Sequence, residues 1–198
     1  DSSSNNWYLK SGIKEKISNY ELKAGSIIPG TLITAINSDL PGQVTAIVRE
    51  TIYDTITGKH ILIVKGTKLI GQYNSVVTFG QNRVMIVWQR LIMPNGDSVD
   101  LENMNGVDLT GASGLTGKVD NHFMKMLGGV VLSAMIGAGT DASEDSTNAT
   151  TYAQESASTI AQGYADKFLN VQPTIKVKQG TKFNIFVNKD MVLRPYGE

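Results

Sequence analysis

The sequence predicts a mainly β fold, in which a β-barrel-like or sandwich body carries an inserted two-helix hairpin. Alternating apolar and polar residues with turn signals run from Gly25 to about Leu101. Short strand-like segments return after residue 173. Between these two regions lie a charge-free apolar run and an amphipathic stretch, both with helical character. Since strands flank the helical part on both sides, an insertion into a β body explains the order better than α/β alternation.

The first β region contains several strands separated by turns. Residues 44–52 alternate as a half-buried strand does, although Ile47 and Glu50 interrupt the pattern. Thr57-Gly58-Lys59 predicts a hairpin turn before a strand at residues 60–64. Residues 83–90 are apolar on both faces at their centre, which is typical of a central strand.

The remaining strands are short. Pro94-Asn95-Gly96 predicts a turn that leads into a strand at residues 98–101. Near the C-terminus, residues 174–177, 183–187 and 191–193 are predicted strands, with a turn at Gln179-Gly180.

The apolar run Met126–Ala138 is the most unusual feature of the chain. Its 13 residues carry no charge, in a chain that otherwise has the polarity of a soluble protein. As a helix the run would be about 20 Å long, which is short of the roughly 30 Å hydrocarbon core of a bilayer. One copy of this helix alone should therefore not span a membrane.

A second helix is predicted over Tyr152–Phe168, after a polar tip at residues 141–151. One face is apolar, and the opposite face is polar. The two helices together make a hairpin that could be a packed pair within a domain, or one stave of an oligomeric pore with its polar face toward a wet lumen. The candidates for the lumen side are Gln154, Glu155, Ser158, Gln162 and Asp166.

Composition limits the classes of function. The 18 basic and 18 acidic residues give no net charge and form no basic run, so nothing predicts a polyanionic partner. The absence of cysteine excludes disulfides, thiolate chemistry and cysteine-ligated zinc, and leaves the redox compartment open. We predict an N-terminal arm or linker at residues 1–24 and a β-barrel-like domain at 25–198, with the hairpin at about 120–169. Because the start has neither Met nor a signal sequence, we expect a fragment or a processed form.

No catalytic, metal or cofactor site is predicted. The glycine-rich residues 111–118 have five residues between Gly111 and Gly117-Lys118, where a phosphate-binding loop needs four, and Val119 follows where a hydroxyl is needed. Ser113 lacks the glycine two positions later that a nucleophile elbow requires. The spacings around His60 and His122 fit no metal-ligand set.

Several blocks of sequence resemble the TrbI-type family of type IV secretion and conjugation channels, in the order in which that family has them. They cover nearly the whole chain from about residue 20 to Tyr196. The blocks are 24–44 (AGSIIPGTLITAINSDLPGQV), 65–75 (KGTKLIGQYNS), 80–96 (GQNRV to WQRLIMPNG), 114–123 (GLTGKVDNHF), 172–174 (QPT) and 187–193 (VNKDMVL).

This resemblance implies a β-barrel-like C-terminal domain of an envelope scaffold, closed rings of copies, and a two-helix antenna that lines a pore in the outer membrane of a Gram-negative bacterium. In a ring, neighbouring helices could enclose the polar faces, and a thin outer membrane reduces the length mismatch. The resemblance also implies a second outer-layer core protein and a small outer-membrane lipoprotein as partners, DNA or protein as transient cargo, and an inner-membrane anchor in the full-length protein. No enzymatic activity is expected.

Roles follow for individual residues. The predicted lipid-facing or neighbour-facing residues are Leu127, Val130, Val131, Leu132, Met135 and Ile136, and those that permit close helix packing are Gly128, Gly129, Ser133, Ala134 and Gly137. The candidates for subunit contact are Trp7, Tyr8, Leu9, Asn37, Asp39, Pro41 and Gly42.

Two rival functions remain open. The first is a soluble periplasmic β-domain that binds a protein partner through its apolar hairpin, without a pore. The second is a hydrolase that uses Ser113.

Overall fold

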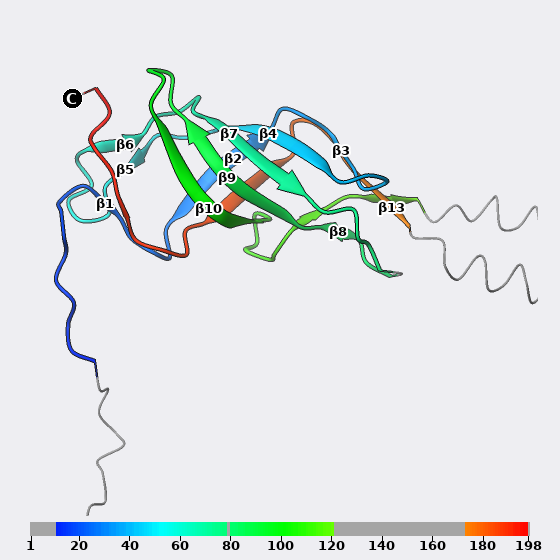
Figure 1. Ribbon diagram of the computed structural model, residues 1–198, viewed down its shortest axis with the longest axis horizontal. Coiled ribbons are helices and arrows are strands. Elements are labelled where there is room, and N and C mark those ends of the chain that lie inside the picture. Colours follow the sequence, from blue (N-terminus) through cyan, green and yellow to red (C-terminus); the bar gives the residue numbers. More distant parts are fainter. Residues whose placement is uncertain (1–10, 79, 121–172, 198) are drawn as a thin grey trace, which may run out of the picture.

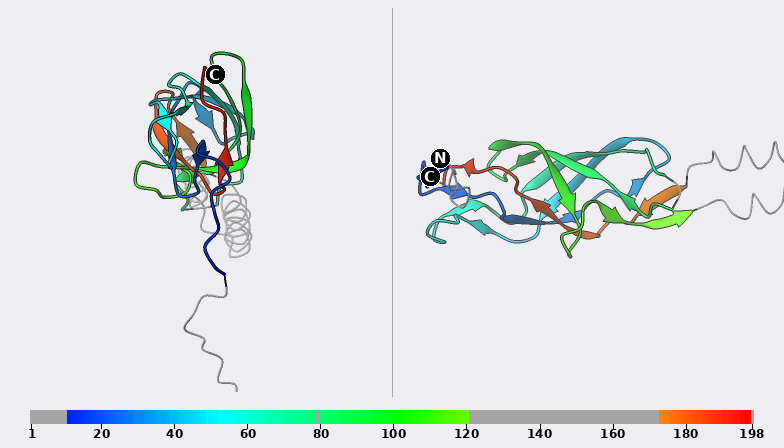
Figure 2. Two further views of the ribbon diagram at one scale, coloured as in Figure 1. Left: turned by 90° about the vertical axis from the view of Figure 1, so that its left-hand side faces the viewer. Right: turned by 90° about the horizontal axis from the view of Figure 1, so that it is seen from below.

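The computed structural model describes residues 11–78, 80–120 and 173–197. These residues form 15 strands and no helix. The body is elongated (Figure 1), and the described parts of both chain termini lie at one end, with β13 at the other (Figure 2). Among the described residues, no helix has the length and apolar character to cross a membrane.

Six antiparallel strands close into a barrel in the order β10-β14-β2-β4-β7-β9. The closed barrel resolves the choice between barrel and sandwich. Its strands are β2 (Ile27–Leu32), β4 (Gly42–Val48), β7 (Lys68–Tyr73), β9 (Ile86–Ile92), β10 (Ser98–Val107) and β14 (Lys182–Phe186).

Four small sheets extend the barrel. At the end that holds the chain termini, β1 (Glu21–Leu22) pairs with β15 (Met191–Val192), and β5 (Ile52–Tyr53) pairs with β6 (Ile61–Ile63). β8 (Arg83–Val84) pairs with β11 (Leu115–Thr116). At the opposite end, β12 (Lys118–Asp120), β13 (Thr174–Val177) and β3 (Ile36–Asn37) form a three-stranded sheet with β13 in the centre.

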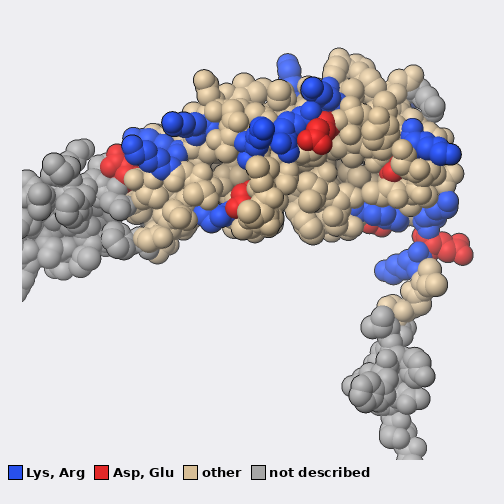
Figure 3. Space-filling view, turned by 180° about the vertical axis from the view of Figure 1, so that it is seen from behind, with Lys and Arg blue, Asp and Glu red and all other residues tan. Residues whose placement is uncertain are grey.

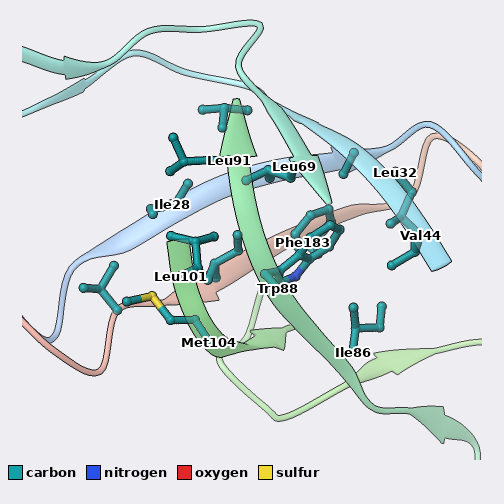
Figure 4. Packing of buried hydrophobic residues seen from close by; sticks show 14 of the residues in the cluster. Ile28, Leu32, Val44, Leu69, Ile86, Trp88, Leu91, Leu101, Met104 and Phe183 are labelled. Atoms are coloured by element: carbon teal, nitrogen blue, oxygen red, sulfur yellow. The ribbon is translucent and has the colours of Figure 1, made fainter. Parts of the chain in front are cut away.

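The barrel interior is filled by apolar side chains, because alternate residues of each strand point inward. At its centre the rings of Trp88 and Phe183 are stacked, with centroids 4.7 Å apart and an interplanar angle of 6° (Figure 4). Both side chains are fully buried. The interior of a single barrel is therefore a packed core and provides no passage.

Glycines on three strands make room for the two rings. A Cβ at Gly30 would lie 2.4 Å from Phe183 Cζ, and one at Gly71 would lie 2.9 Å from Trp88 Cε3. A Cβ at Gly106 would lie 3.0 Å from Trp88 Nε1. These contacts are closer than van der Waals packing allows, so the large ring pair requires glycine at these strand positions.

Most of the predicted strands are confirmed. The three strands at 174–193 and the turns at residues 57–59, 94–96 and 179–180 occur in the structure. The single strand predicted over 83–90 is split at Met85 into β8, which pairs with β11, and β9, which lies in the barrel and continues to Ile92. The alternating segment is shorter than predicted, because β4 ends at Val48 and the chain leaves the barrel to form the β5–β6 pair.

The C-terminal boundary of the strand predicted at 98–101 is wrong, since β10 continues to Val107. Its pairing with β9 shifts register between Asp100 and Met104, and Glu102 and Asn103 there have φ values of 47° and 64°. This bulge breaks the alternation that the prediction relied on.

Candidate functional site

The root of the predicted insertion is the pair of strands β12 and β13. Asp120 pairs with Thr174, Val119 with Ile175, and Lys118 with Lys176. The two ends of the described chain that flank residues 121–172 therefore lie at neighbouring positions in one sheet. This geometry supports an insertion at the end of the body remote from the chain termini (Figure 1).

The two faces of the β12–β13–β3 sheet differ in character. On one face Ile175, Val177 and Ile36 are buried in the core. On the other face Lys118 and Lys176 are exposed, and Lys178 continues the same alternation just after β13. One side of this sheet is thus fixed to the body, and the other side presents exposed lysine side chains.

The turn after β3 holds this sheet in place. Ile175 donates its backbone N–H to Ser38 Oγ at 2.8 Å, and the backbone N–H of Ser38 donates to the carbonyl oxygen of Ile175 at 3.1 Å. The Thr174 hydroxyl donates to Asp39 Oδ1. These contacts join residues more than 130 positions apart in the sequence, which is why Ser38 and Thr174 could not be recognised from the sequence.

Four of the predicted subunit-contact residues lie in this turn. Asn37 Nδ2 donates to Asp39 Oδ2 at 2.9 Å, and Asn37, Asp39 and Pro41 are exposed. Gly42 is half-buried against Tyr73, whose hydroxyl oxygen would lie 2.8 Å from an added Cβ. The turn is confirmed, and its role in subunit contact stays a prediction.

The other candidate site residues lie outside the described residues. These are Trp7, Tyr8 and Leu9 of the arm; Leu127, Gly128, Gly129, Val130, Val131, Leu132, Ser133, Ala134, Met135, Ile136 and Gly137 of the apolar run; and Gln154, Glu155, Ser158, Gln162 and Asp166 of the second predicted helix.

Arg83 fixes the glycine-rich connection that leads to β12. Its guanidinium donates to the carbonyl oxygens of Ala112, Ser113 and Gly114 at 2.8–2.9 Å, and to Asp108 Oδ2 at 2.6 Å. The Thr110 hydroxyl and Arg83 together hold the pKa of Asp108 well below its usual range. The glycine-rich segment is therefore tied to the body through one side chain.

At the opposite end of the body, Asp54 closes the β5–β6 turn. Its buried carboxylate accepts the backbone N–H groups of Gly58, Lys59 and His60 at 2.7–3.1 Å. Burial opposes the charge on Asp54, but hydrogen bonds from the backbone N–H of His60, from Thr57 and from the backbone N–H of Lys59 hold its pKa well below the usual range. The ring of His60 packs edge-on against Tyr20, with centroids 4.9 Å apart, so this residue has a structural role.

The pair β1–β15 is held by a further ionic cluster. The buried carboxylate of Glu21 pairs with Lys23, which also contacts Asp190 at 2.9 Å. The hydrogen bond from Lys23 is the main reason that the pKa of Glu21 is lowered. Over residues 11–78, 80–120 and 173–197, no group of His, Cys, Asp and Glu could hold a metal ion.

Fold and site together define a closed-barrel β domain of the structural scaffold class, and comparison with known proteins supports this class. The family described as "Bacterial conjugation TrbI-like protein" matches residues 21–193. The conjugal transfer protein TrbI of Rhizobium radiobacter is 44% identical over 93% of this chain and 45% of its own length. The type IV secretion system protein virB10 of Bartonella henselae is 32% identical over 87% of this chain and 44% of its own length.

A solved structure shares the fold. ComB10 of the Com type IV secretion system of Helicobacter pylori matches with a TM-score of 0.56 and 22% identity, over 87% of this chain and 89% of that one. The chain spans less than half the length of the curated relatives described above.

The chain belongs to the TrbI-like family of bacterial conjugation proteins. The resemblance found in its sequence is thereby confirmed. The family consists of structural, non-enzymatic components of conjugation and type IV secretion machinery in the cell envelope of Gram-negative bacteria.

This membership overturns the hydrolase hypothesis for Ser113. Within the described chain, the only bond found for Ser113 beyond its strand bridge to Val107 is the one that its carbonyl oxygen accepts from Arg83. His60 directly precedes β6, at the end of the body remote from β8, the strand that pairs with β11 (Figure 1). Among the described residues, no histidine therefore lies beside Ser113.

Proposed function

We propose that residues 121–172 form a two-helix antenna, which crosses the outer membrane in a ring of copies and lines the mouth of a channel. The observation that carries this proposal is the charge-free run Met126–Ala138, inserted between paired strands at one end of the body. A single helix of this length is too short to span a typical bilayer, whereas a ring lets neighbouring copies enclose the polar faces.

Because the barrel interior is filled, a passage would have to run between copies of the chain. The stacked rings of Trp88 and Phe183 and the surrounding side chains occupy the interior of the body. A substrate that passes through the assembly would therefore travel through a space that several copies enclose. Contacts at Trp7, Tyr8 and Leu9 and at the turn Asn37–Gly42 would help to close this ring.

The relatives support conjugation as the process that the full-length protein serves. Two conjugal transfer proteins are 44% identical to this chain, whereas the type IV secretion proteins compared are 32–33% identical. We propose DNA as the cargo, in an assembly with a second outer-layer core protein and a small lipoprotein, and an inner-membrane anchor outside this chain.

Val131→Asp tests the antenna. A carboxylate near the centre of a membrane-crossing helix should cost about 2.5–3.5 kcal/mol, so membrane association and conjugative transfer should both fall. The matched control is Ala142→Asp, which places the same charge in the polar tip.

The measurements are detergent dependence of extraction and transfer frequency in cells that carry the full-length protein. Equal behaviour of the two variants would contradict insertion. Extraction without detergent, together with a retained protein partner, would favour the soluble domain that binds through its apolar hairpin.

A further inference from the structure

The exposed face of the β12–β13–β3 sheet carries more lysines than nearby carboxylates pair with. Lys118 lies directly opposite Lys176 in the strand pair, and Lys178 follows two residues after Lys176. Like charges directly opposite each other on an antiparallel pair destabilise it. The two lysines therefore lower the stability of the β12–β13 pair, and the fold itself does not explain their placement.

Carboxylates nearby compensate this charge only in part. Asp120 lies 3.7 Å from Lys176, and both side chains are about half exposed, so solvent screens the pair. In the part of the chain that the structure describes, Lys118 and Lys178 have no carboxylate within ion-pairing distance. Two amines of this face therefore remain available to an external anion.

A groove of roughly 600 Å³ lies beside these lysines. It is lined by Lys118, Lys176 and Lys178 and by the smaller residues Ala35 and Val177, among others. Lysine suits such a site because its aliphatic stem covers apolar surface while its amine reaches a polar group. The combination fits a ligand with a phosphate next to apolar chains.

The position of the groove indicates where that phosphate comes from. Lys118 and Lys176 each stand two residues from the pair Asp120 and Thr174, which flank residues 121–172 in the sequence. Figure 3 shows Lys and Arg side chains at the end of the body that holds β12 and β13. A surface next to a membrane-crossing segment faces lipid headgroups.

We propose that Lys118, Lys176 and Lys178, here called the lysine face, bind the headgroups of anionic phospholipids where the body meets the membrane. This inference rests on the proposed insertion of residues 121–172. The lysine face would set the depth and the tilt of each body in the ring, because anionic headgroups attract basic side chains only near the surface.

A nucleic-acid backbone offers the same phosphate chemistry, and the structure favours lipid. None of the residues that line the groove is aromatic, whereas sites for single-stranded nucleic acid commonly stack bases on aromatic rings. Asp39 and Asp120 also lie on this sheet or its adjoining turn, which would repel a long polyanion more than a small headgroup.

The test compares binding of the full-length protein to two kinds of vesicle. One is made of phosphatidylcholine alone, and in the other about a third of the lipid is phosphatidylglycerol. Lys118→Gln/Lys176→Gln/Lys178→Gln is compared with Lys59→Gln/Lys65→Gln/Lys68→Gln, which removes the same charge from exposed lysines elsewhere. Flotation measures the bound fraction at low salt and at about 1 M salt.

We expect the wild type and the control variant to bind anionic vesicles more tightly than neutral ones. The lysine-face variant should bind the anionic vesicles about tenfold or more weakly than the wild type does. Each lysine near an anionic surface contributes roughly a fivefold factor, and Asp120 offsets part of the sum. A gain that persists in the lysine-face variant, or an equal loss in both variants, would overturn the proposal.

Two further readouts separate the alternatives. Binding to the neutral vesicles reports the insertion itself, so its sensitivity to Val131→Asp tests the proposed function independently of the lysine face. Fluorescence anisotropy with a single-stranded oligonucleotide tests the nucleic-acid alternative. If the lysine-face variant lost oligonucleotide binding and kept its gain on anionic lipid, the lipid proposal would be wrong.

Discussion

Trp88 and Phe183 show how single residues determine the interior of the barrel. The two rings are stacked near the centre of the core, and three strands carry glycine where a Cβ would strike them. Packing at this density leaves no space into which a ring could move. The fold therefore depends on three glycines as much as on the two aromatic residues.

Gly30→Ala should lower the free energy of unfolding by about 1–3 kcal/mol, because the new methyl group overlaps the ring of Phe183. Gly12→Ala is the control, since nothing lies within 4 Å of that position. Chemical denaturation measures both variants. The double variant Gly30→Ala/Phe183→Leu should recover part of the loss, and a stable single variant would contradict the packing argument.

Asp108 should make stability depend on pH. Its pKa is lowered in the folded protein by Thr110 and Arg83, so its stabilising contribution is fully present above the unfolded value of about 4 and is lost as the pH falls through the folded value. Asp108→Asn should unfold more easily than wild type near pH 7, and the difference should shrink at about pH 3. Thermal unfolding across this range gives the measurement.

A constant difference between Asp108→Asn and wild type at every pH would show that the carboxylate charge has no part in stability. Asp54, Glu21 and Asp190 have lowered pKa values as well. The variant should therefore keep part of the acid sensitivity of the wild type.

Individual strands could be predicted from local pattern, and their arrangement could not. Alternation and turn residues sufficed for β4, β9, β13 and β14. The closure of the barrel depends on β14, which pairs with β2 and β10 across long sequence separations. Such pairings leave no local signal, which is why the sequence left barrel and sandwich both open.

The root of the insertion was predictable only in part. Lys176 and Lys178 alternate with Ile175 and Val177, so one exposed face was already visible in the sequence. The register that brings Lys118 opposite Lys176 was not visible, since it joins residues on both sides of the insertion. The role of Arg83 in holding the glycine-rich segment was likewise not predictable from the sequence, because its acceptors are mostly backbone carbonyl oxygens.

Arg83→Lys should loosen the connection from Asp108 to Gly114 while the barrel stays folded. Lysine keeps the charge and cannot reproduce the forked donor geometry, and each lost hydrogen bond is worth on the order of 1 kcal/mol. Amide exchange at Gly111, Ala112 and Gly114 should accelerate by about tenfold or more. The amide of Gly96 in the β9–β10 turn is the internal control, and equal acceleration there would indicate general destabilisation instead.

The two ends of the body carry different elements. The described ends of the chain and the β5–β6 turn lie at one end of the body, and β12 and β13 lie at the other (Figure 2). If residues 121–172 enter the outer membrane, the body stands with its β5–β6 end away from that membrane. The tip of residues 121–172 and the β5–β6 turn should then face different compartments.

Single cysteines at Ser146 and Lys59 test this orientation, because the chain has no cysteine of its own. Ser146 belongs to the predicted polar tip, and Lys59 is an exposed residue of the β5–β6 turn. A thiol reagent that cannot cross membranes should label Ser146→Cys on intact cells and should label Lys59→Cys only after the outer membrane is permeabilised. Because both variants are measured in the assembled complex, labelling after permeabilisation controls for thiol reactivity. Labelling of neither site on intact cells would mean that the tip stays on the periplasmic side, and the channel mouth would then have to be built by another protein.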